Sequence, residues 1–134
     1  MSLVAKQSTV RWLAPFLADL ACVLVFALAG KASHDGDESD SALVLAIAWP
    51  FALAVACAHC TLILRGRATS RLWPEGVLVF AVTYALGMLL RAVSGRGLAP
   101  AFLVVAALFL ALTMLGWRGI VRLDAKRREA REST

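Results

Sequence analysis

The stretch WLAPFLADLACVLVFALAGKASH, residues 12–34, decides how this chain folds. It is apolar over most of its length, is interrupted once by Asp19, and closes with a polar cluster at residues 30–34. About 20 apolar residues in a helix are enough to cross the roughly 30 Å of hydrocarbon in a bilayer. A carboxylate inside such a span is costly, so Asp19 is expected to have a buried partner or a function.

The rest of the chain repeats this apolar pattern. Of its 134 residues, 60% are hydrophobic and 17% are charged, and the mean hydropathy is +0.76. A soluble domain of this length carries about a quarter charged residues. We therefore predict an all-α polytopic membrane protein, a single domain over residues 1–134 with short loops. Its four transmembrane helices and its basic cytoplasmic tail are expected at residues 12–30, 41–64, 72–90, 97–117 and 118–134.

The basic residues predict the orientation of these helices. Eleven Lys and Arg residues fall on one side of the predicted membrane and three on the other. The positive-inside rule then places both termini in the cytoplasm of a protein in the cytoplasmic (inner) membrane. The net charge of +5 is explained by this topology and by contact of the tail with anionic headgroups, without a nucleic-acid partner. The bias also predicts that a homodimer has its two-fold axis along the membrane normal.

Two side chains are candidate partners for Asp19. At a rise of 1.5 Å per residue, Asp19 and His59 lie at the same level, roughly 9–10 Å above the predicted cytoplasmic edge. Arg118 lies one side-chain length below Asp19 and is the second candidate. The segment Cys57-Ala58-His59-Cys60 lacks the two ligand pairs of a structural metal site, so we predict no metal there. Nearby, Trp49-Pro50 lies inside the second helix and is expected to kink it or to line a pathway.

Other polar and small residues gather toward the outer end. Thr83, Gly87 and Arg91 recur every four residues and share one helix face. The Thr83–Gly87 pair has the small-xxx-small spacing that lets another helix, such as one from a second copy, approach closely. Lys31, Ser33 and His34 end the first helix on the same side of the membrane as Arg91. They are expected to form a basic outer vestibule with it.

Several short motifs follow one another in a characteristic order. They are Asp19, Gly30-Lys31-Ala32-Ser33-His34, Trp49-Pro50-Phe51, Gly87-Met88-Leu89-Leu90-Arg91 and Gly116-Trp117-Arg118. In this order the chain resembles the small four-helix membrane proteins catalogued as domain of unknown function family 3054. Lys31 stands where that family leads us to expect Arg. The resemblance implies the four-helix fold over nearly the whole chain, but it implies no activity.

Two functions fit these features. The first is a homo-oligomeric carrier or channel for a small solute, such as an anion or a proton-coupled substrate, with Asp19 as the protonatable group. The second is a structural or accessory protein that binds lipid or a partner protein without transport. An enzyme is not expected, because Asp19 and His34 are roughly 20 Å apart along the helix, and no cofactor is predicted. The candidate solute- or ion-binding residues are Asp19, Lys31, Ser33, His34, Trp49, Pro50, Thr83, Gly87, Arg91 and Arg118.

Overall fold

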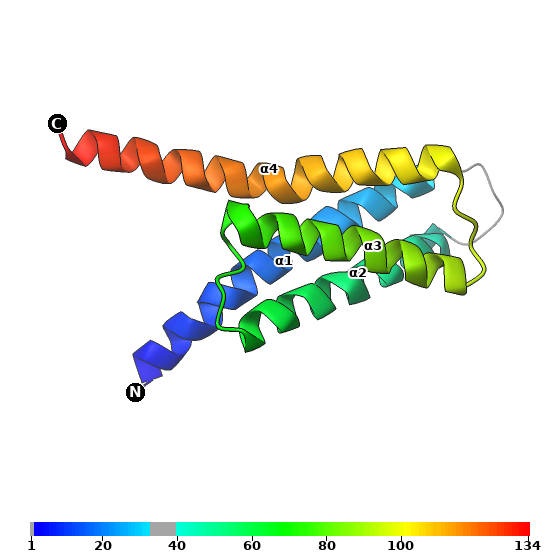
Figure 1. The fold of residues 1–134 in the computed structure, drawn as a ribbon, viewed down its shortest axis with the longest axis horizontal. Coiled ribbons are helices and arrows are strands. Elements are labelled where there is room, and N and C mark those ends of the chain that lie inside the picture. The colour runs from blue at the N-terminus through cyan, green and yellow to red at the C-terminus, as the bar shows by residue number, and fades with distance from the viewer. Residues whose placement is uncertain (1, 33–39) are drawn as a thin grey trace.

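The computed structural model describes residues 2–32 and 40–134, and the regular structure in this part of the chain is helical throughout (Figure 1). Four of its helices are long and apolar enough to cross a membrane. The predicted all-helical, multi-pass membrane fold is therefore confirmed. The elements are α1 (Ser2–Ala32), α2 (Asp40–Leu64), a short irregular segment η1 (Leu72–Gly76), α3 (Val77–Val93) and α4 (Pro100–Glu132).

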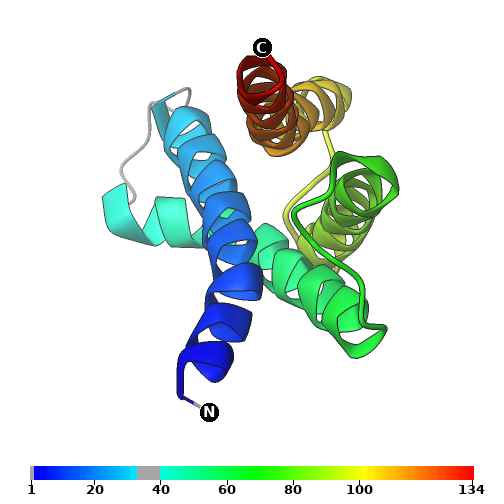
Figure 2. The ribbon, with the colours of Figure 1, turned by 90° about the vertical axis from the view of Figure 1, so that its left-hand side faces the viewer.

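The four helices form an elongated bundle in which consecutive helices are neighbours (Figures 1 and 2). The packing of α2 against α1 and α3 is the most extensive, whereas α4 contacts both α1 and α3 over a smaller area. Both chain termini lie at one end of the bundle (Figure 1). The loop that joins α2 to η1 lies at this same end, so polar groups from several elements meet there.

Two helices extend further than the apolar runs predict. Helix α1 begins at Ser2, and α4 continues to Glu132 as a helix of 33 residues. A helix of this length measures about 50 Å, which exceeds the hydrocarbon thickness by about 20 Å. The charged segment after Trp117 contains no proline, and Arg128 contacts Asp124 at 3.0 Å across one turn. The basic tail is therefore the last part of α4 and not a separate element.

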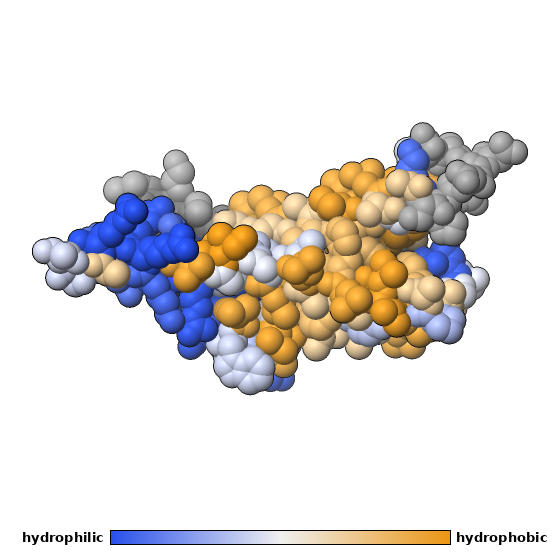
Figure 3. Space-filling view, turned by 90° about the horizontal axis from the view of Figure 1, so that it is seen from above, coloured by the Kyte–Doolittle hydropathy of each residue, from blue (hydrophilic) through white to orange (hydrophobic). Residues whose placement is uncertain are grey.

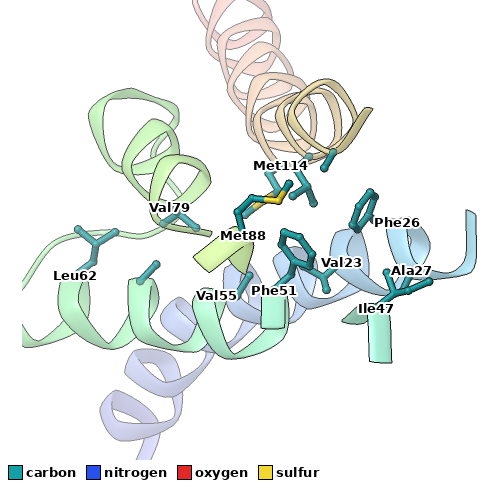
Figure 4. Close-up of a cluster of buried hydrophobic side chains, with 13 residues drawn as sticks. Val23, Phe26, Ala27, Ile47, Phe51, Val55, Leu62, Val79, Met88 and Met114 are labelled. Carbon is teal, nitrogen blue, oxygen red and sulfur yellow. The ribbon is translucent and has the colours of Figure 1, made fainter. Parts of the chain in front are cut away.

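The core is apolar and draws on all four helices (Figure 4). The Phe26 ring of α1 meets the Phe51 ring of α2 edge to face, with centroids 5.3 Å apart. Phe51 also packs on Gly87 of α3, where an added Cβ would lie 2.7 Å from the Phe51 Cε1 atom. Thr83, on the same face, is fully buried. The Thr83–Gly87 face is thus occupied by this chain's own α2, and the prediction that it receives a second copy is wrong.

The surface of the bundle is apolar in the middle and hydrophilic at the end that holds the two chain termini. In Figure 3 hydrophobic residues cover the central band, and hydrophilic residues gather at the end where α1 begins and α4 finishes. Large apolar side chains such as Leu45, Leu108 and Leu112 are more than half exposed. This distribution suits a bundle whose middle faces lipid and whose ends face water.

Candidate functional site

A buried ion pair joins α1 to α4 near the terminal end of the bundle. The Arg118 guanidinium donates from Nη1 to Asp19 Oδ1 at 2.8 Å and from Nη2 to Asp19 Oδ2 at 2.7 Å. Both side chains are 0% exposed. This two-point contact is the strongest geometry available to a carboxylate and an arginine, because two parallel charge-assisted hydrogen bonds fix distance and orientation together.

Two further donors complete the environment of Asp19. His59 of α2 lies with Nε2 2.7 Å from Oδ2, and Trp117 of α4 donates from Nε1 to Oδ1 at 2.9 Å. Each carboxylate oxygen therefore has two hydrogen-bond partners, which is its usual capacity. His59 Nδ1 has no hydrogen-bond partner among the described residues, whereas Nε2 faces a carboxylate acceptor and is the donor of the pair. We call Asp19, His59, Trp117 and Arg118 the Asp19 cluster.

The donors of Arg118 are also fully used. Its Nε and Nη2 donate to the backbone carbonyl of Thr69, at 3.2 and 2.9 Å, and its Nη1 donates to the carbonyl of Met114 at 2.9 Å. Together with the two bonds to Asp19, these contacts employ all five guanidinium N–H groups. A buried polar network stabilises a fold only when its members are satisfied. Arg118 meets this condition, and its hydrogen bonds to the Thr69 carbonyl hold the loop before η1 against α4.

The start of α3 is shaped to admit Arg118. A Cβ at Gly76 would lie 2.7 Å from Arg118 Cδ and 2.8 Å from the Arg71 carbonyl oxygen, so a side chain larger than hydrogen does not fit. The adjacent Glu75 is 1% exposed and accepts a hydrogen bond from Arg67 Nε at 3.0 Å. Arg71 Nε lies 3.8 Å from its other oxygen. The Asp19 cluster therefore joins α1, α2 and α4 and contacts η1 at Gly76.

An open groove of about 650 Å³ lies beside the cluster. It runs between the first part of α1, the loop at residues 66–70 and the face of α4 that carries Trp117, and we call it the Arg11 groove. Thr69 and Trp117 contact the Asp19 cluster and also line the groove. Asp19, His59 and Arg118 are not among its lining residues. The ion pair is thus separated from the groove by one layer of side chains.

The predicted site residues fall into three places. Asp19 and Arg118 meet as predicted, and His59 joins them, so both candidate partners of Asp19 are correct. Trp49 is 42% exposed on the bundle surface, whereas Pro50 is buried, and α2 passes through Pro50 without interruption. Thr83 and Gly87 belong to the core, as described above.

The remaining predicted residues concern the opposite end. Lys31 lies in the last turn of α1, and Ser33 and His34 lie outside the described residues. Arg91 donates from Nε to the Gly97 carbonyl at 3.3 Å, and its guanidinium carbon lies 4.0 Å above the Phe102 ring centroid. The Arg91 side chain is therefore held against the start of α4. The proposed vestibule with Lys31 and His34 stays a prediction.

The cysteines of α2 and the single tyrosine are the remaining polar side chains with possible chemistry. Cys57 and Cys60 are exposed on α2 while His59 between them is buried against Asp19. Within residues 2–32 and 40–134, no set of three or more His, Cys, Asp and Glu side chains is arranged to hold a metal ion. The phenol of Tyr84, the single tyrosine, donates to the Leu103 carbonyl at 3.0 Å.

Sequence reasoning missed Thr69, Glu75 and Gly76, and it named Trp117 only as part of the Gly116-Trp117-Arg118 motif. The Thr69 contribution is a backbone carbonyl, which carries no signal in the side-chain pattern. Glu75 and Gly76 did offer a signal, because Trp-Pro-Glu-Gly at residues 73–76 interrupts an apolar run with an acid and a helix breaker. Trp117 adjoins Arg118 in the sequence, and its indole N–H needs an acceptor when buried.

A search of curated proteins and a search of solved structures each found no significant match. A family model described as "Protein of unknown function (DUF3054)" matches residues 16–121, and this range contains every member of the Asp19 cluster. The match covers well over half of the chain and agrees with the motif order and the four-helix fold. The chain therefore belongs to the DUF3054 family.

Proposed function

We propose that this chain is an accessory protein of the cytoplasmic membrane that binds lipid or a partner at its cytoplasmic face, without transport or catalysis. The observation that carries the proposal is the state of Asp19, which is fully buried with both oxygens saturated by donors. On this reading the Asp19 cluster fixes the arrangement of the helices. The bundle then acts as a rigid anchor for the groove and the basic end of α4.

The same observation argues against a transport role for Asp19. A carboxylate that exchanges protons or cations needs a path to water, and its ligand must displace existing partners. Displacement here would break four hydrogen bonds and leave Arg118 as an unpaired buried charge, which is strongly unfavourable. Apolar residues such as Val23, Phe51 and Leu110 are packed in the core of the same bundle.

The proposed orientation places both termini and the Arg11 groove in the cytoplasm, by the positive-inside rule. In a background without its three cysteines, we expect a membrane-impermeant maleimide to label Arg96→Cys in intact cells. Thr134→Cys should react only after the membrane is permeabilised. Reaction of Thr134→Cys in intact cells, with Arg96→Cys protected, would reverse the orientation. If copies of the chain pair, this single orientation requires a two-fold axis along the membrane normal.

A carrier for a small anion or a proton-coupled solute is the second candidate, and the basic groove favours it. We expect proteoliposomes loaded with pyranine, under a potassium diffusion potential, to acidify at the rate of protein-free liposomes. The Asp19→Asn protein should give that same rate. Faster acidification with the unmodified protein, lost in Asp19→Asn, would replace the accessory proposal by proton-coupled transport. Retention of the excess flux in Asp19→Asn would place a transport path elsewhere in the bundle.

A further inference from the structure

We propose that the Arg11 groove binds one anionic phospholipid, with the headgroup phosphate between Arg11 and Arg67 and an acyl chain along the apolar wall. This inference rests on the proposed function and adds the ligand class and its binding site. It is carried by three features of the groove: its charge, an unpaired hydroxyl at its base, and its apolar walls.

The charge of the groove suits an anion. Arg11 and Arg67 line it, and no carboxylate is among its lining residues. Arg67 contacts Glu75 through Nε, which orients the guanidinium, while Nη1 and Nη2 make no hydrogen bond to a described residue. The planar pair of terminal N–H₂ groups is well matched to two phosphate oxygens. Glu75 therefore positions Arg67 for an anion and leaves its terminal donors available.

The base of the groove holds a polar group without a partner. Thr69 is 2% exposed and lines the groove, and its hydroxyl oxygen is enclosed and has no hydrogen-bond partner among the described residues. The Thr69 carbonyl is occupied by Arg118, so the residue is held in place by its backbone. An unpaired buried hydroxyl is unfavourable, and rotation of the Thr69 side chain toward the groove would let a headgroup oxygen satisfy it. This observation is independent of the two arginines.

The walls favour a lipid over a free anion. Ala14, Pro15, Ile63 and Val121 line the groove together with the rings of Trp12 and Trp117. Trp12 is 41% exposed and lies at the predicted boundary of the membrane, where tryptophan rings sit at headgroup level. A small inorganic anion would use the arginines but would leave these walls uncovered. An amphiphile with a phosphate and an apolar chain matches both parts.

The test uses the full-length protein in a non-ionic detergent and follows its thermal unfolding. Ligands that bind the native state raise the melting temperature by an amount that grows with the logarithm of the ratio of ligand concentration to Kd, once that ratio exceeds one. The probes are dihexanoyl-phosphatidylglycerol, dihexanoyl-phosphatidylcholine and inorganic phosphate at matched concentrations and ionic strength. We expect phosphatidylglycerol to give a rise that follows this concentration dependence and that neither other probe reproduces. An equal rise with phosphatidylcholine would overturn the requirement for an anionic headgroup, and an equal rise with inorganic phosphate alone would overturn the lipid assignment.

Two variants test whether phosphatidylglycerol raises the melting temperature by binding in the Arg11 groove. Arg11→Gln is expected to weaken the apparent affinity for phosphatidylglycerol about tenfold, because a charge-assisted contact is lost. Arg122→Gln removes the same charge from an exposed position outside the groove and should leave the affinity unchanged. Equal losses in both variants would indicate general charge attraction and would contradict a site at the groove.

Thr69→Val provides a separate test of the groove base. Valine keeps the shape of threonine and the backbone carbonyl that Arg118 uses, but it removes the unpaired hydroxyl. We expect the ligand-free melting temperature to stay the same or rise, while the affinity for phosphatidylglycerol falls about threefold or more. Unchanged affinity would exclude the hydroxyl as a ligand. Failure of these binding experiments would leave the orientation and proton-flux results unaffected, so the two proposals fail separately.

Discussion

Replacing Asp19 with Asn is expected to lower the free energy of unfolding by about 3–5 kcal/mol. The amide has the size of the carboxylate but no charge, so Arg118 would remain buried without a counter-ion. Its NH₂ group would also face two of the donors that now bind Asp19, namely Arg118 together with either Trp117 or His59. The decrease in the free energy of unfolding can be measured by equilibrium unfolding in mixed micelles.

Asp124→Asn is the matched control for this variant. Asp124 also pairs with an arginine, Arg128, at 3.0 Å, but both side chains are more than half exposed. Exposed pairs one helical turn apart contribute about 0.3–0.5 kcal/mol, so this change should be close to neutral. A similar loss from Asp19→Asn and Asp124→Asn would show that burial of the Asp19 cluster contributes nothing to stability.

A double replacement separates the charges from the packing. Asp19→Leu with Arg118→Met removes both charges and keeps most of the volume, and such exchanges are often neutral or stabilising at buried ion pairs. We expect the double variant to be more stable than Asp19→Asn, although His59 and Trp117 lose their acceptor. If the double variant were the less stable protein, the hydrogen bonds of Arg118 to the Thr69 and Met114 carbonyls would be the dominant contribution.

Much of this site could be predicted because helices in a membrane obey simple length rules. The apolar runs fix four spans, and a constant rise per residue gives each polar residue a depth. Asp19, His59 and Arg118 were matched by depth alone, and the structure brings all three together. Depth is a reliable guide here because a buried charge requires a partner and few polar residues exist at that level.

Other features depend on which faces meet, and the sequence does not determine this. The spacing of Thr83 and Gly87 predicts that a helix approaches closely, but the partner is α2 of the same chain. The backbone carbonyls of Thr69 and Met114 could not be predicted as acceptors for Arg118, because the pattern of side chains contains no information about them. The end of α4 is a separate case, because the apolar run predicts the membrane span at residues 97–117 and not the length of the helix, which continues to Glu132. A change from apolar to charged residues marks the edge of the membrane, whereas a helix continues until its backbone is interrupted.

The packing at Gly87 gives the second large expected effect. Gly87→Ala should cost about 1–3 kcal/mol, the usual range for inserting volume into a close-packed core, because the added Cβ would overlap the buried Phe51 ring. Gly116→Ala is the control, since a Cβ there meets no atom within 4 Å. That change should be neutral or stabilising by up to about 1 kcal/mol, as alanine is the better helix former.

A double-mutant cycle with Phe51→Leu identifies the contact responsible. Leucine is smaller and more adaptable than the phenylalanine ring, so the penalty for Gly87→Ala should fall by about 1 kcal/mol or more in the Phe51→Leu background. The same background should not change the effect of Gly116→Ala. An unchanged penalty at Gly87 would mean that alanine disturbs something other than Phe51.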